Sequence, residues 1–150
     1  MPPKKRTVKG AYHEASKKTV KPENGYENSK IIWCFDRIDR NGPFAFDVNR
    51  QDFLPREILD KMISYSSMTW REITRHTHDD GKSKHHFLND ADKFSDAARA
   101  RISAMKLGED TDHIFSFALQ NKLRVIGLRD REFFHVLWYD PRHEFYPSQR

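Results

Sequence analysis

The chain has one cysteine among 150 residues, six glycines and no long hydrophobic run. Because Cys34 has no partner for an internal disulfide, the sequence favours a reducing compartment, and we expect a cytoplasmic protein. No segment of about 18 apolar residues is present, so we predict no membrane-spanning helix and no membrane partner. The charged first residues are not followed by the apolar segment of a secretory signal, so we do not expect export.

The sequence also lacks the motifs of the commonest enzyme and metal sites. It contains no glycine-rich phosphate loop, no cysteine pair with zinc spacing and no nucleophile elbow. Its eight histidines never form the HxxxH or HExxH spacing that places two zinc ligands on one helix face. We therefore predict neither a metal site nor a cofactor, and any catalysis has to rest on side chains alone.

The positive charge of the chain is concentrated at its N-terminus. The formal net charge is +5, and residues 1–30 carry eight Lys or Arg against three Glu, which accounts for the whole excess. The remainder of the chain is therefore neutral, and its high pI does not predict a nucleic-acid-binding face on a folded domain.

The N-terminal segment is predicted to be a disordered basic tail. Residues 1–29 lack apolar periodicity and are rich in Lys, Pro, Gly, Asn and Glu, so they cannot bury enough surface to offset the entropy of ordering. This leaves residues 30–150 as a single α+β domain. The tail is either a solvated extension that keeps the protein soluble or a weak, salt-sensitive contact for nucleic acid through Lys4, Lys5 and Arg6.

Apolar periodicity predicts the element order β-α-α-α-β-β-β. The predicted strands are residues 31–35, 114–119, 123–128 and 133–139, and the predicted helices are residues 53–66, 70–75 and a third that begins after Ser95. Because the turns between the last three strands are short enough for hairpins, we expect helices packed on an antiparallel sheet of about four strands.

Local signals support the helix assignments. Thr69 and Glu72 have the spacing of a capping box, Ser95 is a helix N-cap, and Gly108 is expected just past the end of the third helix. The first helix is expected to bury one apolar stripe, formed by Leu54, Ile58, Leu59, Met62 and Ile63.

The last strand is predicted to lie inside the sheet, because both of its faces are apolar. One face is expected to carry Phe134, Val136 and Trp138, and the other Phe133, Leu137 and Tyr139. His135 interrupts the second face, either as a core residue with satisfied hydrogen bonds or as a catalyst.

The preceding strand carries a cation in apolar surroundings. Arg124 shares a face with Ile126 and Leu128, so its guanidinium either reaches to the sheet edge or binds an anion such as phosphate. The sequence alone leaves both interpretations open.

The C-terminal segment after the last strand also allows two interpretations. A turn that starts at Asp140 and Pro141 places His143 and Tyr146 near the end of the sheet. The segment is either a clasp, in which Phe145 and Tyr146 pack and Arg142 pairs with an acid, or part of a patch that reads bases and moves protons.

The residue types of the C-terminal third match the needs of RNA cleavage without a metal. Such a site needs a group that activates the ribose 2′-hydroxyl, a cation for the phosphate and an acid for the leaving oxygen. On this hypothesis the catalytic residues are Arg124, His135, His143 and Tyr146, and further RNA contacts come from Tyr139 and Arg142.

Two segments of the C-terminal third resemble the RelE/ParE-type toxin superfamily. They are residues 114–127, which include the arginine-bearing strand, and residues 134–140, which form the apolar strand with its aromatic and histidine ending. The chain also resembles a group of uncharacterised bacterial and phage proteins, which share the helix start Met68-Thr69-Trp70, the pair His85-His86 and the ending from Leu137 to His143.

The resemblance implies a RelE/ParE-like fold in which Arg124 contacts substrate phosphate and His143 or Tyr146 takes the place of the terminal catalytic residue. The implied activity is that of a toxin-like, metal-independent endoribonuclease or translation inhibitor of bacterial or phage origin. RNA or the ribosome is then the expected target, and an antitoxin-like protein is an expected partner. The alternative is a non-enzymatic module of a mobile element that binds nucleic acid or protein.

Overall fold

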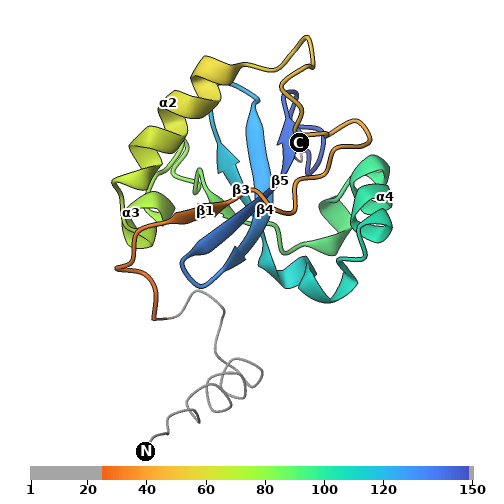
Figure 1. Cartoon of the computed structure of the whole chain (residues 1–150). Coiled ribbons are helices and arrows are strands. Elements are labelled where there is room, and N and C mark those ends of the chain that lie inside the picture. The colour runs from red at the N-terminus through yellow and green to blue at the C-terminus, as the bar shows by residue number, and fades with distance from the viewer. Residues whose placement is uncertain (1–24, 149–150) are drawn as a thin grey trace, which may run out of the picture.

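The computed structural model describes residues 25–148 and has the α+β architecture that the sequence predicts (Figure 1). The strands are β1 (Ile32–Cys34), β2 (His86–Phe87), β3 (Ile114–Ala118), β4 (Arg124–Asp130) and β5 (Phe133–Asp140). The helices are α2 (Pro55–Ser66), α3 (Trp70–Thr74) and α4 (Asp96–Ala104), with the 3-10 helices η1 (Ala91–Lys93) and η2 (Gly108–His113). Lys4, Lys5 and Arg6 lie outside the described residues.

The strands form one five-stranded sheet in the order β1-β5-β4-β3-β2. The last three strands make the antiparallel meander that the short turns predict, but β1 pairs with β5 in parallel. The expectation of an antiparallel sheet of about four strands is therefore wrong in both respects. The β1–β5 pairing joins segments about a hundred residues apart, and no local pattern encodes it; β2 has only two residues and lies in a segment with no strand signal.

Helices and loops cover both faces of the sheet, as Figure 1 shows with α2 and α3 on one side and α4 on the other. The first core cluster contains Ile58 and Tyr65 of α2 and Trp70 and Ile73 of α3. The second cluster holds the residues that α4 and the C-terminal segment press against the opposite face, including Phe94, Ala98, Ile102, Leu107 and Phe145. No helix in the described part of the chain is long and apolar enough to span a bilayer.

The predicted helix caps are confirmed. Thr69 accepts a hydrogen bond from the Glu72 amide while the Glu72 side chain accepts from the Thr69 amide, which is the reciprocal capping box. Ser95 accepts from the amide of Ala98 at the start of α4. The expected helix end at Gly108 is wrong, because Lys106 takes the left-handed conformation (φ 59°) and Gly108 opens η2 instead.

The predicted apolar stripe of α2 is only partly correct. Ile58 is buried and Met62 packs against the first cluster, but Leu59 and Ile63 are 59% and 62% exposed. The rotation of the helix is fixed by Tyr65, whose ring stacks on Phe117 at 5.1 Å and whose hydroxyl donates to the Ala118 carbonyl at 3.3 Å. Leu54, the first member of the predicted stripe, is also exposed. The apolar stripe is thus wider than the face that the sheet covers.

A bulge in β5 changes the predicted faces of that strand. Ile126 of β4 pairs with Trp138 and the next residue, Gly127, pairs with Val136, so Leu137 is the extra residue. As a result Trp138 packs in the second cluster and not beside Val136. Gly127 is required here, because a Cβ at this position would collide with the carbonyl oxygen of His135.

Candidate functional site

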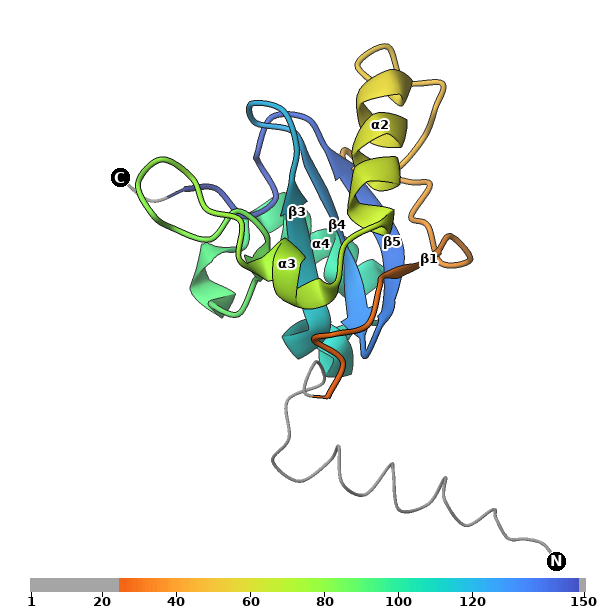
Figure 2. The same ribbon diagram turned by 90° about the vertical axis from the view of Figure 1, so that its left-hand side faces the viewer.

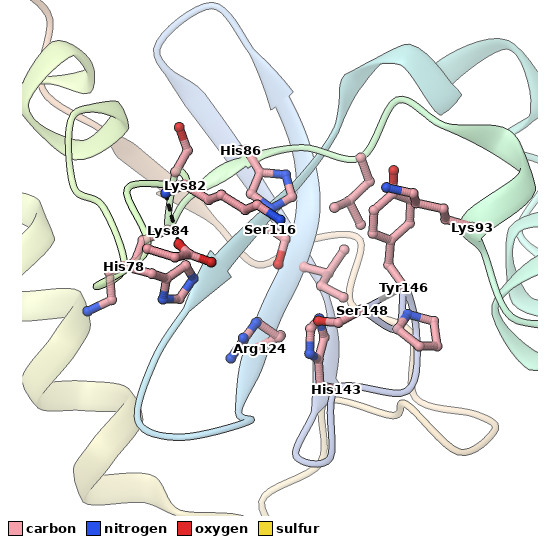
Figure 3. A pocket seen from close by; sticks show the side chains of 15 residues that line it. His78, Lys82, Lys84, His86, Lys93, Ser116, Arg124, His143, Tyr146 and Ser148 are labelled. Carbon is pink, nitrogen blue, oxygen red and sulfur yellow. Dashed lines mark hydrogen bonds between the residues drawn. The ribbon is translucent and has the colours of Figure 1, made fainter. Parts of the chain in front are cut away.

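A pocket with a volume of about 410 Å³ lies where three parts of the chain meet (Figure 3). One wall is the segment 76–86, the floor is the face of β3 and β4, and the opposite wall is the C-terminal segment with η1. The polar and charged lining residues are His78, Asp80, Lys82, Ser83, Lys84, His86, Lys93, Ser116, Arg124, His143, Tyr146 and Ser148. Cationic and imidazole side chains far outnumber the one carboxylate, so the pocket suits an anion.

The first wall is a hairpin that projects from the sheet beside the C-terminal segment (Figure 2). The amide of His78 donates to the Lys82 carbonyl at 2.8 Å, and the amide of Lys84 donates to the His76 carbonyl at 2.9 Å. Gly81, with φ of +86°, makes the tight turn at the tip. These backbone contacts place Lys82 and Lys84 in the lining of the pocket.

Arg124 lies at the start of β4 and emerges from an apolar face beside Ile126, as its strand position predicts. Its Nη1 donates to the carbonyl oxygens of Asn121 and Leu123 at 2.9 and 3.0 Å, which fixes the orientation of the guanidinium. Burial lowers the pKa of Arg124, and the carboxylate of Asp140 opposes this change. A guanidinium stays protonated at neutral pH, so this part of the pocket carries a fixed positive charge.

Asp140 also shapes the opposite wall. Its carboxylate accepts hydrogen bonds from the amides of Glu144 and Phe145 at 3.0 and 2.8 Å, which closes the turn that follows β5. Within this turn His143 has a left-handed backbone (φ 59°) and its side chain lines the pocket. The buried ring of Phe145 anchors the turn against Trp138 at 4.5 Å. The pair Asp140-Pro141 therefore starts a turn, as predicted, and that turn positions His143.

His143 is uncharged at neutral pH. Burial lowers its pKa to about 4, and the nearby positive charges of Arg124 and His86 add to the effect. A neutral imidazole has one ring nitrogen with a free lone pair, so His143 is able to accept a proton from a bound ligand. A negatively charged ligand beside Arg124 would offset the same charges and make that proton transfer easier.

His86 is the second imidazole with a defined orientation in this pocket. Its Nδ1 lies 3.0 Å from the carbonyl oxygen of Phe87, and since a carbonyl only accepts, Nδ1 carries a proton. Nε2 is therefore the ring nitrogen that exchanges a proton with a ligand. The neighbouring His85 is buried instead: it is 1% exposed and packs against Tyr65 and Phe117.

The pocket brings together Arg124, His143 and Tyr146 from the predicted catalytic set. Tyr146 lines it with its ring, and its hydroxyl accepts a hydrogen bond from the Asp90 amide at 3.1 Å. His135 lies elsewhere, with Nδ1 3.4 Å from the carboxylate of Asp36. The structure thus separates His135 from the other three residues.

The two remaining predicted RNA contacts also lie outside the pocket. Tyr139 is fully buried, and its hydroxyl donates to the Asp52 carbonyl at 2.8 Å and accepts from the Leu54 amide at 2.9 Å. A ring in this position presents no face to a base. Arg142 is 62% exposed and pairs with Asp52 at 3.6 Å, so the acid partner proposed for the clasp is Asp52.

Sequence reasoning missed the pocket residues that precede β3, namely Lys82, Lys84, His86 and Lys93. The adjacent pair His85-His86 did not reveal which of the two histidines faces a pocket. Within residues 25–148 no group of three or more His, Cys, Asp or Glu side chains is arranged to hold a metal ion.

Comparison of the chain with protein-family models, with curated proteins and with solved structures gave no match. The resemblance to RelE/ParE-type toxins therefore stays a prediction, and the chemistry has to be argued from the pocket itself.

Proposed function

We propose that this protein is a metal-independent endoribonuclease of the toxin-like kind, with its active site in the pocket of Arg124, His86 and His143. The observation that carries the proposal is that a fixed cation and two oriented imidazoles line one pocket, together with Lys82, Lys84 and Lys93. These are the groups that phosphodiester cleavage by a ribose hydroxyl requires: a clamp for the phosphate, a proton acceptor and a proton donor.

In the proposed reaction Arg124 holds the scissile phosphate and stabilises the charge that develops on its oxygens. His143, neutral because of its lowered pKa, takes the proton of the ribose 2′-hydroxyl. The 2′-oxygen attacks phosphorus, and the bond from phosphorus to the 5′-oxygen breaks. His86 in its protonated form gives Nε2–H to that leaving oxygen. The products are a 2′,3′-cyclic phosphate and a 5′-hydroxyl, and exchange with water restores both histidines.

The alternative is a nucleic-acid-binding module without catalysis, and the number of lysines around the pocket favours it. Lys82 and Lys84 on the hairpin and Lys93 on η1 exceed what one phosphate needs, and they would hold several phosphates of one strand. Both functions use the same pocket and the same class of ligand, so cleavage decides between them.

The test is incubation of the full-length protein with a single-stranded RNA in EDTA, with a search for products that end in a cyclic phosphate. We expect Arg124→Gln, His143→Asn and His86→Asn each to lower the cleavage rate by at least about 100-fold, the lower end for general acid–base groups. Asparagine is chosen for His143 because it tolerates the left-handed backbone there. Circular dichroism checks that each variant is folded.

His135→Asn is the matched control, because it removes an imidazole outside the pocket and should leave the cleavage rate per folded molecule unchanged. A second readout is expression in bacteria, where the wild type should arrest growth and the three pocket variants should not. Failure of the wild type to cleave any RNA, or equal cleavage by all variants, would overturn the nuclease; RNA binding that Lys82→Gln weakens would then favour the binding module.

A further inference from the structure

A second pocket, with a volume of about 310 Å³, lies beside the first on the other face of the sheet. It is lined by Glu27, Trp70, Thr74, Ser83, His85, His86, Phe87, Phe115 and Arg129. Ser83 and His86 line both pockets, so the segment from Ser83 to the edge strand β2 forms the ridge between them. A volume of this size is within the range of small-molecule sites and is large enough for one nucleobase.

The walls of the second pocket are aromatic and cationic. The Arg129 guanidinium lies 3.9 Å from the centre of the Trp70 ring and 5.9 Å from that of Phe87. Arg129 is only 1% exposed, so its charge acts from within the wall and favours a ligand that carries negative charge or a polarisable ring. Phe87 is partly buried and offers an apolar surface at the rim.

Glu27 is the acidic side chain of this lining and adds a hydrogen-bonding preference. One of its carboxylate oxygens, Oε1, accepts from the amide of Gly25 at 3.0 Å. A carboxylate accepts two hydrogen bonds side by side, and among the RNA bases guanine presents two adjacent N–H donors on its Watson–Crick edge. Adenine, cytosine and uracil present one such donor group each, so they pair less well.

We infer that the second pocket binds a guanine base of the RNA strand whose phosphate lies in the first pocket. The strand crosses the ridge at Ser83 and His86, so that neighbouring nucleotides lie on opposite faces of the sheet. Bases separated in this way cannot remain paired, and the site therefore takes single-stranded RNA and excludes a duplex. This inference rests on the proposed function, because it assumes that the ligand of the first pocket is RNA.

The experiment measures binding and cleavage separately. Binding is measured with labelled trinucleotides that carry 2′-O-methyl riboses, which prevents attack by the 2′-oxygen, and that differ only in one base (G, A, C or U). We expect the wild type to bind the probe with guanine in the favoured position about tenfold more tightly than the others, the size of a good base-specific contact. Glu27→Gln should remove most of this preference, and Glu109→Gln, at an exposed site outside both pockets, should retain it.

Three outcomes would overturn the inference: equal affinity for all four bases, a guanine preference that survives in Glu27→Gln, or equally tight binding of a duplex of the same sequence. These outcomes are distinct from failure of the proposed function. A protein that cleaves RNA through Arg124 but is indifferent to Glu27→Gln lacks only the second subsite. A protein that cleaves no RNA, yet binds guanine through Glu27, keeps the subsite and loses the nuclease.

Discussion

At the scale of single residues, three histidines of this chain occupy three different environments. His85 is enclosed by aromatic rings, His143 is partly buried beside Arg124, and His86 is exposed with one nitrogen held by a carbonyl oxygen. Only the environment distinguishes them, because the side chains are identical. The environment therefore decides which imidazole is structural and which is available for proton transfer.

His85 is neutral in the folded protein, and its tautomer follows from its contacts. Its Nδ1 accepts from the Ala118 amide at 3.1 Å, so Nε2 carries the proton and donates to Nδ1 of His76 at 3.3 Å. Burial lowers the pKa of His85 from 6.5 to about 3. The unfolded chain therefore binds a proton below pH 6.5 that the folded chain does not bind until about pH 3.

Because the unfolded chain binds this extra proton, the free energy of unfolding is expected to fall as the pH is lowered from 6.5 towards 3. Between pH 7 and pH 5, His85 alone should remove about 2 kcal/mol. His143, whose pKa is also lowered, adds to the loss in the same range. The measurement is urea unfolding at several pH values for the wild type and His85→Asn, in which the amide oxygen replaces Nδ1 as acceptor and does not titrate. The variant should show a shallower pH dependence.

Ile102→Val serves as a control, because it weakens the other core cluster by about 1 kcal/mol and keeps the imidazole. It should shift stability equally at every pH. If wild type and His85→Asn instead gave parallel curves, His85 would not be the buried neutral group described here.

Residue-scale reasoning from the sequence succeeded where the decisive contact is local. The capping box of Thr69 and Glu72 joins residues only three positions apart, so both partners are visible in the sequence. The sequence did not show that His135 lies outside the pocket, because the partner of that histidine, Asp36, is 99 positions away in the chain. Such contacts depend on strand pairing, which sequence periodicity does not specify.

At the scale of elements, the sequence predicted β1, the strands of the meander and the three helices, but it predicted neither the parallel pairing of β1 with β5 nor the strand β2. The pattern of β5 predicted a strand buried on both faces, which is confirmed, but it could not predict the bulge at Gly127 that reorients Trp138. The pocket depends on the edge strand β2 and its hairpin, a polar segment that has no strand periodicity. For that reason none of the lining residues from this segment, which are His78, Asp80, Lys82, Ser83, Lys84 and His86, was in the predicted site.

The start of the domain also depends on contacts between elements. The carbonyl of Ser29 accepts from the Trp70 amide at 3.0 Å, and the carbonyl of Glu27 accepts from the Arg71 amide at 2.7 Å. These amides belong to the first turn of α3, where backbone N–H groups have no acceptor within the helix. Residues 27–29 thus cap α3. They precede residue 30, where the domain was predicted to begin, and yet they contact it.

Two truncations are expected to differ in stability for this reason. Removal of residues 1–24 leaves the caps of α3 in place, whereas removal of residues 1–29 takes both carbonyl acceptors away. The longer truncation should be less stable than the shorter one by about 1–3 kcal/mol, the sum for two backbone hydrogen bonds. Thermal or urea unfolding of the two proteins measures the difference. Equal stability would show that water replaces the two carbonyls at no cost.

At the scale of the whole molecule, the distribution of charge matters more than its sum. Residues 1–24 carry seven Lys or Arg against two Glu, so the remaining chain has no formal net charge. The sequence therefore gave no reason to expect a cationic site on the folded part. The fold nevertheless gathers Lys82, Lys84, Lys93 and Arg124 around one pocket. A neutral domain can thus present a locally positive surface, and net charge is a poor guide to its ligands.

The salt dependence of RNA binding distinguishes the pocket from the N-terminal segment as the main electrostatic contact. Each phosphate neutralised on a single strand contributes a slope of about −0.7 to a plot of log affinity against log salt concentration. Four cations in the pocket therefore predict a slope of up to about −3, measured with a 2′-O-methyl oligonucleotide. Deletion of residues 1–24 should leave most of that slope, and the double variant Lys82→Gln/Lys84→Gln should reduce it by about 1.4. If the deletion flattened the slope and the double variant left it unchanged, the N-terminal lysines and not the pocket would be the main electrostatic contact for RNA.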